Sequence, residues 1–196
     1  MQSVGRIRPE PPMTAPALHS QAGHPDYGRL SIALHWLMLI LLAAVFACIE
    51  LRVNYPRGSA IREGLKTWHF MLGLSVFVLV WVRLIARRKM PWLAPESGWM
   101  RWPAAAAHVA LYGGMIALPL LGWLTLSADG DTIPFFGLSL PPLIAQDKDL
   151  AHQLEDLHKT IGEAGYWLIG LHALAAVFHH YVLKDGTLRR MLPGWR

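Results

Sequence analysis

The sequence has few charged residues and only one cysteine. Asp, Glu, Lys and Arg make up 16% of the 196 residues, whereas a soluble domain averages about 25%. The lone cysteine, Cys48, excludes an intramolecular disulfide and a cysteine-ligated metal cluster, and we expect it to pack as a small hydrophobic residue. With 54% hydrophobic residues and nine tryptophans, the composition instead indicates an integral membrane protein.

The first 26 residues have neither the apolar core nor the small-residue cleavage site of a secretory signal peptide. They contain five prolines, which are Pro9, Pro11, Pro12, Pro16 and Pro25, and little that a core would bury. We therefore predict a flexible tail over residues 1–26 and one compact domain over residues 27–196, whose first spanning helix directs insertion.

Four apolar segments are long enough to cross a membrane as helices. They cover about residues 30–49, 67–86, 104–126 and 160–183, and about 20 helical residues span the roughly 30 Å hydrocarbon core of a bilayer. The sequence therefore predicts an all-α, integral membrane four-helix bundle with one sizeable loop at 129–157. We expect Pro119 to kink the third helix, Gly113 and Gly114 to allow close helix approach, and Arg83 to snorkel to the interface.

The distribution of basic residues predicts the orientation of the bundle. Four spans place both termini and the middle loop on one side, which carries 12 of the 18 Lys and Arg residues. By the positive-inside rule that side is the cytoplasm. This bias and contact with anionic lipid headgroups account for the basic pI, so no nucleic-acid partner is expected.

Histidines lie within the spans and at their ends, where imidazole is costly unless it faces the bundle interior, a pathway or a metal. His69 and His158 begin the second and fourth spans on the outer side, and His35 lies early in the first span on the inner side. His158 and His172 are 14 residues apart, which places them within about 40° of one helix face and about 21 Å apart along it. Depth predicts an outer pair of His69 with His158 and leaves His172 or His179 as the inner partner of His35.

Haem suits these histidines better than another metal does. A structural zinc site needs four close ligands, and a carboxylate-bridged metal pair needs acidic residues inside the helices. Haem needs axial ligands, an apolar slot and small residues on the helices that flank it. Four glycines on the second and fourth helices provide that room, and these are Gly73, Gly162, Gly165 and Gly170. Two axial histidines leave iron no open position, which favours electron transfer over oxygen binding.

The chain resembles the bacterial cytochrome b561 family over about residues 27–193. The resemblance lies in the stretches SIALHWL at 31–37, ELR at 50–52, YPR at 55–57 and ALP at 117–119. The longest match runs from LHKT at 157–160 through IGLHA at 169–173 and HHY at 179–181 to KDGTLRRM at 184–191.

The resemblance implies a bacterial inner-membrane protein with two b-type haems, one held by His35 and His172 and the other by His69 and His158. It also implies an oxidoreductase of the superoxide oxidase type, which oxidises periplasmic superoxide to dioxygen and reduces membrane ubiquinone. The alternative is an electron-transferring membrane anchor for a periplasmic dehydrogenase or hydrogenase. A non-redox transporter would use the same histidines as a proton relay and would bind no haem.

Basic residues on the outer side suit an anionic substrate. Arg52, Arg57 and Lys66 lie in a segment with a net charge of +2, which would raise the encounter rate of superoxide. Anchoring to lipid headgroups explains them equally well. The second outer segment, from 129 to 163, has a net charge of −5 and would repel an anion.

The remaining histidines divide between the inner side and solvent. His108, His179 and His180 lie near the inner ends of the third and fourth helices, where histidine could donate a proton to a quinone. We expect His19, His24 and His152 to be exposed.

Overall fold

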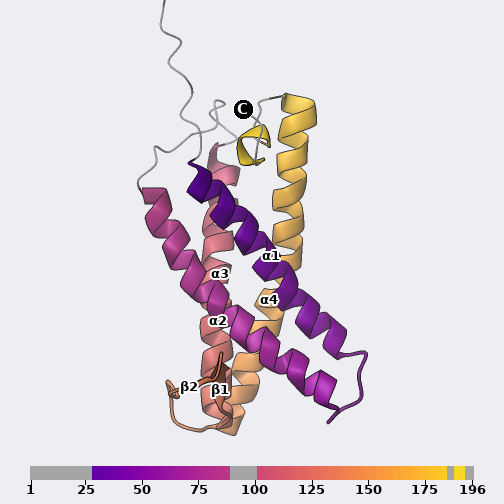
Figure 1. Ribbon diagram of the computed structural model, residues 1–196, viewed down its shortest axis with the longest axis vertical. Coiled ribbons are helices and arrows are strands. Elements are labelled where there is room, and N and C mark those ends of the chain that lie inside the picture. The colour runs from indigo at the N-terminus through magenta and orange to yellow at the C-terminus, as the bar shows by residue number, and fades with distance from the viewer. Residues whose placement is uncertain (1–27, 89–100, 185–187, 193–196) are drawn as a thin grey trace, which may run out of the picture.

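The computed structural model describes residues 28–88, 101–184 and 188–192, and four long helices dominate it (Figure 1). These are α1 (Arg29–Arg52), α2 (Ala60–Arg88), α3 (Arg101–Asp129) and α4 (Lys148–Phe178). All four are long and apolar enough to span a membrane, which confirms the predicted all-α membrane bundle. The predicted tail, with His19 and His24, lies outside the described residues.

The helices extend beyond the apolar segments that predicted them. Helix α4 begins at Lys148 because Asp147 caps it, its carboxylate accepting a hydrogen bond from the backbone N–H of Leu150 at 3.0 Å. The prediction of a loop up to residue 157 is therefore wrong from residue 148 onward, although His152, now in α4, is exposed as expected. At its other end α4 continues into a π-helical turn, η1 (His179–Leu183), and a short 3₁₀ turn, η2 (Arg189–Met191), follows.

A small β-hairpin occupies the first half of the predicted loop. Strands β1 (Ile133–Phe135) and β2 (Leu138–Leu140) pair antiparallel, with Phe135 opposite Leu138. The two residues between them have positive φ, 46° at Phe136 and 86° at Gly137, as a type I′ turn requires. Strands of three residues and a phenylalanine in the turn give little sequence signal, so the hairpin was not predicted.

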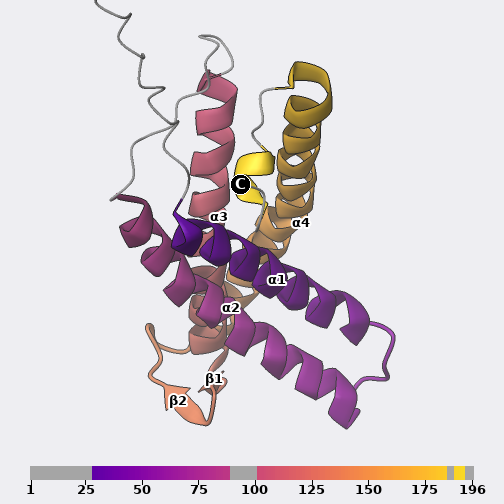
Figure 2. The same cartoon turned by 45° about the horizontal axis from the view of Figure 1, so that its top comes forward.

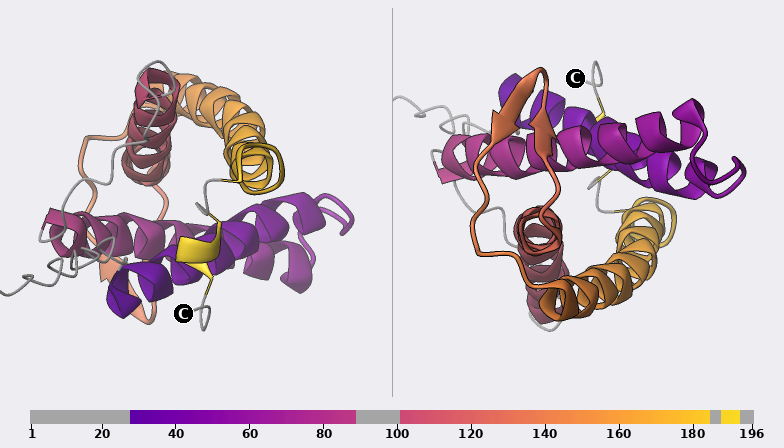
Figure 3. Two further views of the ribbon diagram at one scale, coloured as in Figure 1. Left: turned by 90° about the horizontal axis from the view of Figure 1, so that it is seen from above. Right: turned by 90° about the horizontal axis from the view of Figure 1, so that it is seen from below.

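The helices associate as two antiparallel pairs, α1 with α2 and α3 with α4 (Figures 2 and 3). A buried cluster of Met38, Val76 and Val80 joins α1 to α2, and Tyr112 and Met115 of α3 pack against it. Large apolar side chains elsewhere are exposed along the helices, as expected where the surrounding medium is lipid and only part of each helix faces protein.

Two expectations concern α3. Pro119 lies inside the helix, which continues through it, and the kink expected there stays a prediction. A Cβ added at Gly113 or Gly114 would meet nothing within 4 Å, so the prediction of close helix approach there is wrong. Gly114 instead lines a cavity between the helices.

The hairpin packs onto the end of the bundle that the charge distribution predicts to face outward, which we call the outer end. Ile133, only 2% exposed, is buried against Leu74 of α2 and Leu126 of α3. An ion pair of 3.5 Å between Lys66 and Asp131 joins α2 to the segment that leads into the hairpin. The hairpin therefore covers this end of the bundle through buried apolar contacts.

Replacement of Ile133 by alanine should destabilise the outer end of the bundle. Truncation of a buried isoleucine costs about 2–5 kcal/mol, and each kcal/mol lowers the Tm of a chain of this size by about 2–4 °C. Thermal unfolding in detergent measures the effect. Leu138→Ala is the matched control, because Leu138 lies in the same hairpin and is 65% exposed. Equal Tm values for the two variants would contradict the burial of Ile133.

Candidate functional site

Two pairs of imidazole rings lie inside the bundle, and α4 contributes one ring to each. The outer pair joins His69 of α2 to His158 of α4, with ring centroids 6.1 Å apart. The inner pair joins His35 of α1 to His172 of α4, with centroids 6.5 Å apart. The structure thus brings together the outer pair that depth predicted and the inner pair that the family resemblance implied.

The spacing within each pair fits a single metal ion between the rings. A metal–imidazole bond is about 2 Å long and a ring nitrogen lies about 1 Å from the ring centre, so two trans ligands have centroids about 6 Å apart. In the described part of the chain, no three or more His, Cys, Asp or Glu residues form a metal-binding cluster. A metal that brings its own equatorial ligands, as haem iron does, therefore fits these pairs better than a bare ion.

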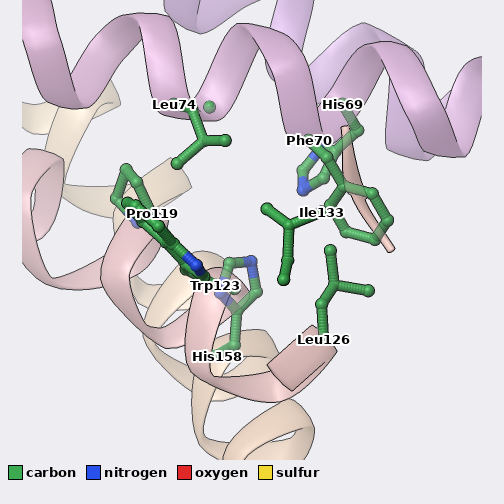
Figure 4. A pocket seen from close by; sticks show the side chains of 10 residues that line it. His69, Phe70, Leu74, Pro119, Trp123, Leu126, Ile133 and His158 are labelled. Carbon is green, nitrogen blue, oxygen red and sulfur yellow. The ribbon is translucent and has the colours of Figure 1, made fainter. Parts of the chain in front are cut away.

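Backbone carbonyls surround the second nitrogens of the outer pair. Nδ1 of His69 lies 3.0 Å from the carbonyl oxygen of Val45. If Nδ1–H donates this hydrogen bond, the Nε2 lone pair is free for a metal, which is the common arrangement of ligating histidines. Nδ1 of His158 is buried and makes no hydrogen bond to any residue that the structure describes, and the carbonyl of Leu118 is the nearby acceptor. Figure 4 shows both rings beside Ile133 of the hairpin.

An apolar cavity connects the outer pair to the middle of the bundle. Its empty space, open side included, is about 710 Å³. His69 and His158 line it together with four glycines, which are Gly73, Gly114, Gly162 and Gly165. Added Cβ atoms at Gly73 and Gly162 would meet nothing within 4 Å, so these glycines leave open the space that a flat cofactor needs. Gly170 also faces open space but does not line this cavity.

A third imidazole lies at the inner level. The ring of His108 is centred 5.5 Å from that of His172, and its Nδ1 is 2.8 Å from the carbonyl oxygen of Ala104 one turn earlier. His179, the alternative inner ligand, lies in η1 and has its ring against that of Phe178. The ring contacts of His172 are therefore with His35 and His108.

Arg83 points into the bundle, and the expectation that it snorkels to the interface is wrong. Its Nε donates to the hydroxyl of Tyr112 at 3.0 Å, and its Nη1 donates to the carbonyl of Ser31 at 3.3 Å. Its Nη2 lies 3.2 Å from Nδ1 of His35. Because α2 continues to Arg88, Arg83 is more than one turn from the helix end. The sequence signal for an inward-facing Arg83 is that it is a charged residue inside an otherwise apolar span.

The outer cations do not form one patch. Lys66 pairs with Asp131 and lies 5.7 Å from the ring centre of Phe70. Arg57 is exposed in the turn between α1 and α2, whereas Arg52 is half-buried, with an Nε that is buried and makes no hydrogen bond. Arg62 donates to the carbonyls of Arg52 and Tyr55 and so caps the end of α1.

One polar contact that the sequence did not reveal joins α1 to α4. The hydroxyl of Tyr166 donates to a carboxylate oxygen of Glu50 at 2.7 Å, and its ring lies 4.3 Å from that of Phe46. Phe46 and Gly165 both line the cavity. The Tyr166–Glu50 bond therefore holds the two helices together beside the cavity wall.

Comparisons with known proteins agree over nearly the whole chain. A sequence model of the family described as prokaryotic cytochrome b561 matches residues 26–194. Cytochrome b561 homolog 1 of Escherichia coli (strain K12) is 34% identical over 170 residues, which are 85% of this chain and 97% of that protein. A probable superoxide oxidase CybB of Yersinia pestis is 38% identical over 173 residues, which are 87% and 97%. A cytochrome b562 of Cereibacter sphaeroides is 31% identical over 172 residues, which are 86% and 96%.

Filling the cavity should prevent cofactor binding without unfolding the bundle. In Gly162→Leu the new side chain would enter the cavity that His69 and His158 line, so we expect loss of haem absorbance from the outer pair. Gly64→Leu is the control, because Gly64 also has open space around its Cα but does not line the cavity. The ratio of Soret absorbance to protein, measured on monodisperse purified protein, checks this. Full haem content in Gly162→Leu would exclude the cavity as the site.

Proposed function

The chain belongs to the prokaryotic cytochrome b561 family, and from this premise we propose that it holds two b-type haems and transfers electrons across the membrane. The observation that carries the proposal is that the imidazole rings form two facing pairs, with ring centroids 6.1 Å apart in one pair and 6.5 Å apart in the other. His69 and His158 would hold one haem, and His35 and His172 the other. When bound, the haems supply one-electron redox chemistry.

The protein contributes to this chemistry by positioning the two haems and by excluding oxygen and water from the iron. Helix α4 carries a ligand for each haem, and 14 helical residues between them correspond to about 21 Å. With two histidines holding each iron, no position would remain for oxygen, which suits electron transfer. The apolar lining of the cavity would keep water from a bound cofactor and so affect its potential.

We propose superoxide as the electron donor and ubiquinone as the acceptor. Two superoxide anions would each lose one electron to give dioxygen, and ubiquinone would take up two electrons and two protons to give ubiquinol. The 38% identity to a protein named as a probable superoxide oxidase supports this assignment. Arg52 is half-buried on the outer side, and its positive charge would attract a small anion to this end of the bundle. Arg57 and Lys66 would contribute only to long-range attraction, since Arg57 is exposed and Lys66 is paired with Asp131.

Ubiquinone would be reduced on the inner side, where several histidines gather. His108 is next to His172, and His180 packs its ring against Tyr181 at 4.7 Å in the π-helical turn. π-Helical turns occur frequently at functional sites. His108, His179 or His180 would donate a proton or a hydrogen bond to the quinone. With the excess of basic residues on this side, the inner side is the cytoplasm of a bacterial inner-membrane protein.

A second candidate function is an electron-transferring membrane anchor for a periplasmic redox protein. The exposed acidic side chains Asp149 and Asp156 on the outer turns of α4, with the exposed Phe136 and Leu138 of the hairpin, would offer a partner a mixed acidic and apolar surface. Co-purification with a periplasmic dehydrogenase or hydrogenase subunit would favour this function, whereas rapid reduction by superoxide alone would favour the first.

Each histidine pair should hold its own haem. We expect two haems per chain by pyridine haemochrome assay, and loss of one in His158→Ala, since the outer iron would lose an axial ligand. His172→Ala should lose or alter the other. His152→Ala, an exposed residue of the same helix, is the control and should keep two. Loss of both haems from one substitution, with the control intact, would mean that the pairs are not independent sites.

Superoxide should reduce the purified oxidised protein at a near-diffusional rate in stopped-flow measurements. The salt dependence reports which outer charges matter. Steering by Arg52 and its neighbours predicts a rate that falls as ionic strength rises, because salt screens the attraction. Arg52→Gln should lower the rate and weaken its salt dependence, whereas Lys159→Gln, whose cation pairs with Glu155 on the same helix, should change neither by as much. Absence of superoxide-driven reduction would reject this donor and leave the two-haem assignment intact.

A further inference from the structure

Arg83 is a cation inside a membrane-spanning helix, and its hydrogen bonds go only to neutral groups. Its acceptors are the Tyr112 hydroxyl, the Ser31 carbonyl and Nδ1 of His35. Among residues 28–88, 101–184 and 188–192, no carboxylate forms an ion pair with it. Arg83 is half-buried, and a guanidinium withdrawn from water without a counter-anion is costly, so this position suits an anionic ligand.

The contact between Arg83 and His35 is incompatible with iron binding by a neutral His35. Arg83 can only donate, so Nδ1 of His35 must accept, which leaves the proton of a neutral ring on Nε2. A neutral imidazole that binds iron through Nε2 carries its proton on Nδ1 instead, and one that binds through Nδ1 has no lone pair left there. In either case Nη2 of Arg83 loses its acceptor when His35 becomes a ligand.

We propose that Arg83 then binds a carboxylate, and that this carboxylate is a propionate of the inner porphyrin. The inference rests on the proposed assignment of His35 as an axial ligand. When His35 binds iron, Nη2 of Arg83 loses Nδ1 of His35 as its acceptor, and the porphyrin that carries the iron also carries the propionate that would replace it. A guanidinium presents its N–H donors in a planar fork that suits a carboxylate. Among the described residues, three of the five N–H groups of Arg83 point to acceptors.

Three helices hold the guanidinium of Arg83 in position for this role. Arg83 itself comes from α2, Ser31 from α1 and Tyr112 from α3, and Ser31 is buried. Arg87, one turn further along α2, lies 6.0 Å from the centre of the Tyr112 ring. Tyr112 is thus held between two arginines, and its hydroxyl accepts from Arg83 while its ring faces Arg87. The bonds to Ser31 and Tyr112 do not involve His35, so they can persist when a ligand replaces the histidine contact.

The test compares how fast the inner haem is lost from two proteins reconstituted with two porphyrins. Wild type and Arg83→Met are loaded with iron protoporphyrin IX or with its dimethyl ester, and transfer of haem to apomyoglobin is followed by absorbance. With the free acid we expect loss of the inner haem to be at least tenfold faster from Arg83→Met, and loss of the outer haem to be unchanged. With the ester, both proteins should lose the inner haem at the same fast rate.

Two further variants keep the test decisive. Arg87→Met removes a cation from the same helix that faces the Tyr112 ring, and it should change the rate less than twofold. Arg83→Lys keeps the charge without the planar fork, so it should lose the inner haem at a rate between those of wild type and Arg83→Met. If Arg83→Met does not fold, faster loss from Arg83→Lys than from wild type still tests the proposal. Equal retention of acid and ester by wild type would overturn the proposal and would point to another anion, such as a lipid phosphate.

Redox titration provides an independent readout. Because removal of a cation beside the iron disfavours the reduced state, the reduction potential of the inner haem should be lower in Arg83→Met. The equilibrium constant for its reduction should fall at least tenfold, which is about 59 mV for one electron. A rise would overturn the proposal, because it would mean that Arg83 stabilises a doubly deprotonated His35. Wild type with fewer than two haems would instead contradict the proposed function, whereas two haems and no change in Arg83→Met would contradict only the present inference.

Discussion

The structure depends on placing imidazole inside an apolar bundle at two depths. An unpaired polar ring is costly in hydrocarbon, and the cost is offset when the ring ligates a metal and donates its second N–H to a carbonyl. Helix α4 carries one ring of each pair, His158 and His172, while α2 and α1 supply the others. A single helix therefore fixes the separation of the two sites, because the rise between its two histidines is set by backbone geometry.

The remaining packing serves to keep the space between the helices open. The buried apolar cluster around Met38, Val76 and Val80 holds α1 against α2 with α3 beside them. Four glycines stand among the apolar side chains that line the cavity between the pairs of helices, and they leave space that larger residues would fill. Contacts at the outer end then close the bundle, namely the Tyr166–Glu50 hydrogen bond and the Ile133 cluster. A bundle packed throughout with large residues would be more compact but would have no room for a cofactor.

The sequence predicts most of this arrangement because membrane helices are governed by a few strong constraints. Length and hydropathy were sufficient for the four helices, and depth along them was sufficient to match His69 with His158. Depth could not choose between His172 and His179, because ring direction depends on how α4 turns and on the π-helical turn that follows. The hairpin and the early start of α4 depend on local contacts in a polar segment, such as the Asp147 cap. The inward direction of Arg83 depends on where α2 ends, which hydropathy does not reveal.

The length of α4 sets where the outer histidine pair lies relative to lipid. Its 31 residues correspond to about 46 Å at 1.5 Å per residue, which exceeds the roughly 30 Å of hydrocarbon. The polar residues of α4 lie at its beginning, so the turns from Lys148 onward would project past the acyl chains beside the hairpin. His158 comes ten residues after Lys148, about 15 Å along the helix, and would lie where the hydrocarbon begins. A charged reductant that cannot dissolve in lipid would therefore come close to this site while it remains in water.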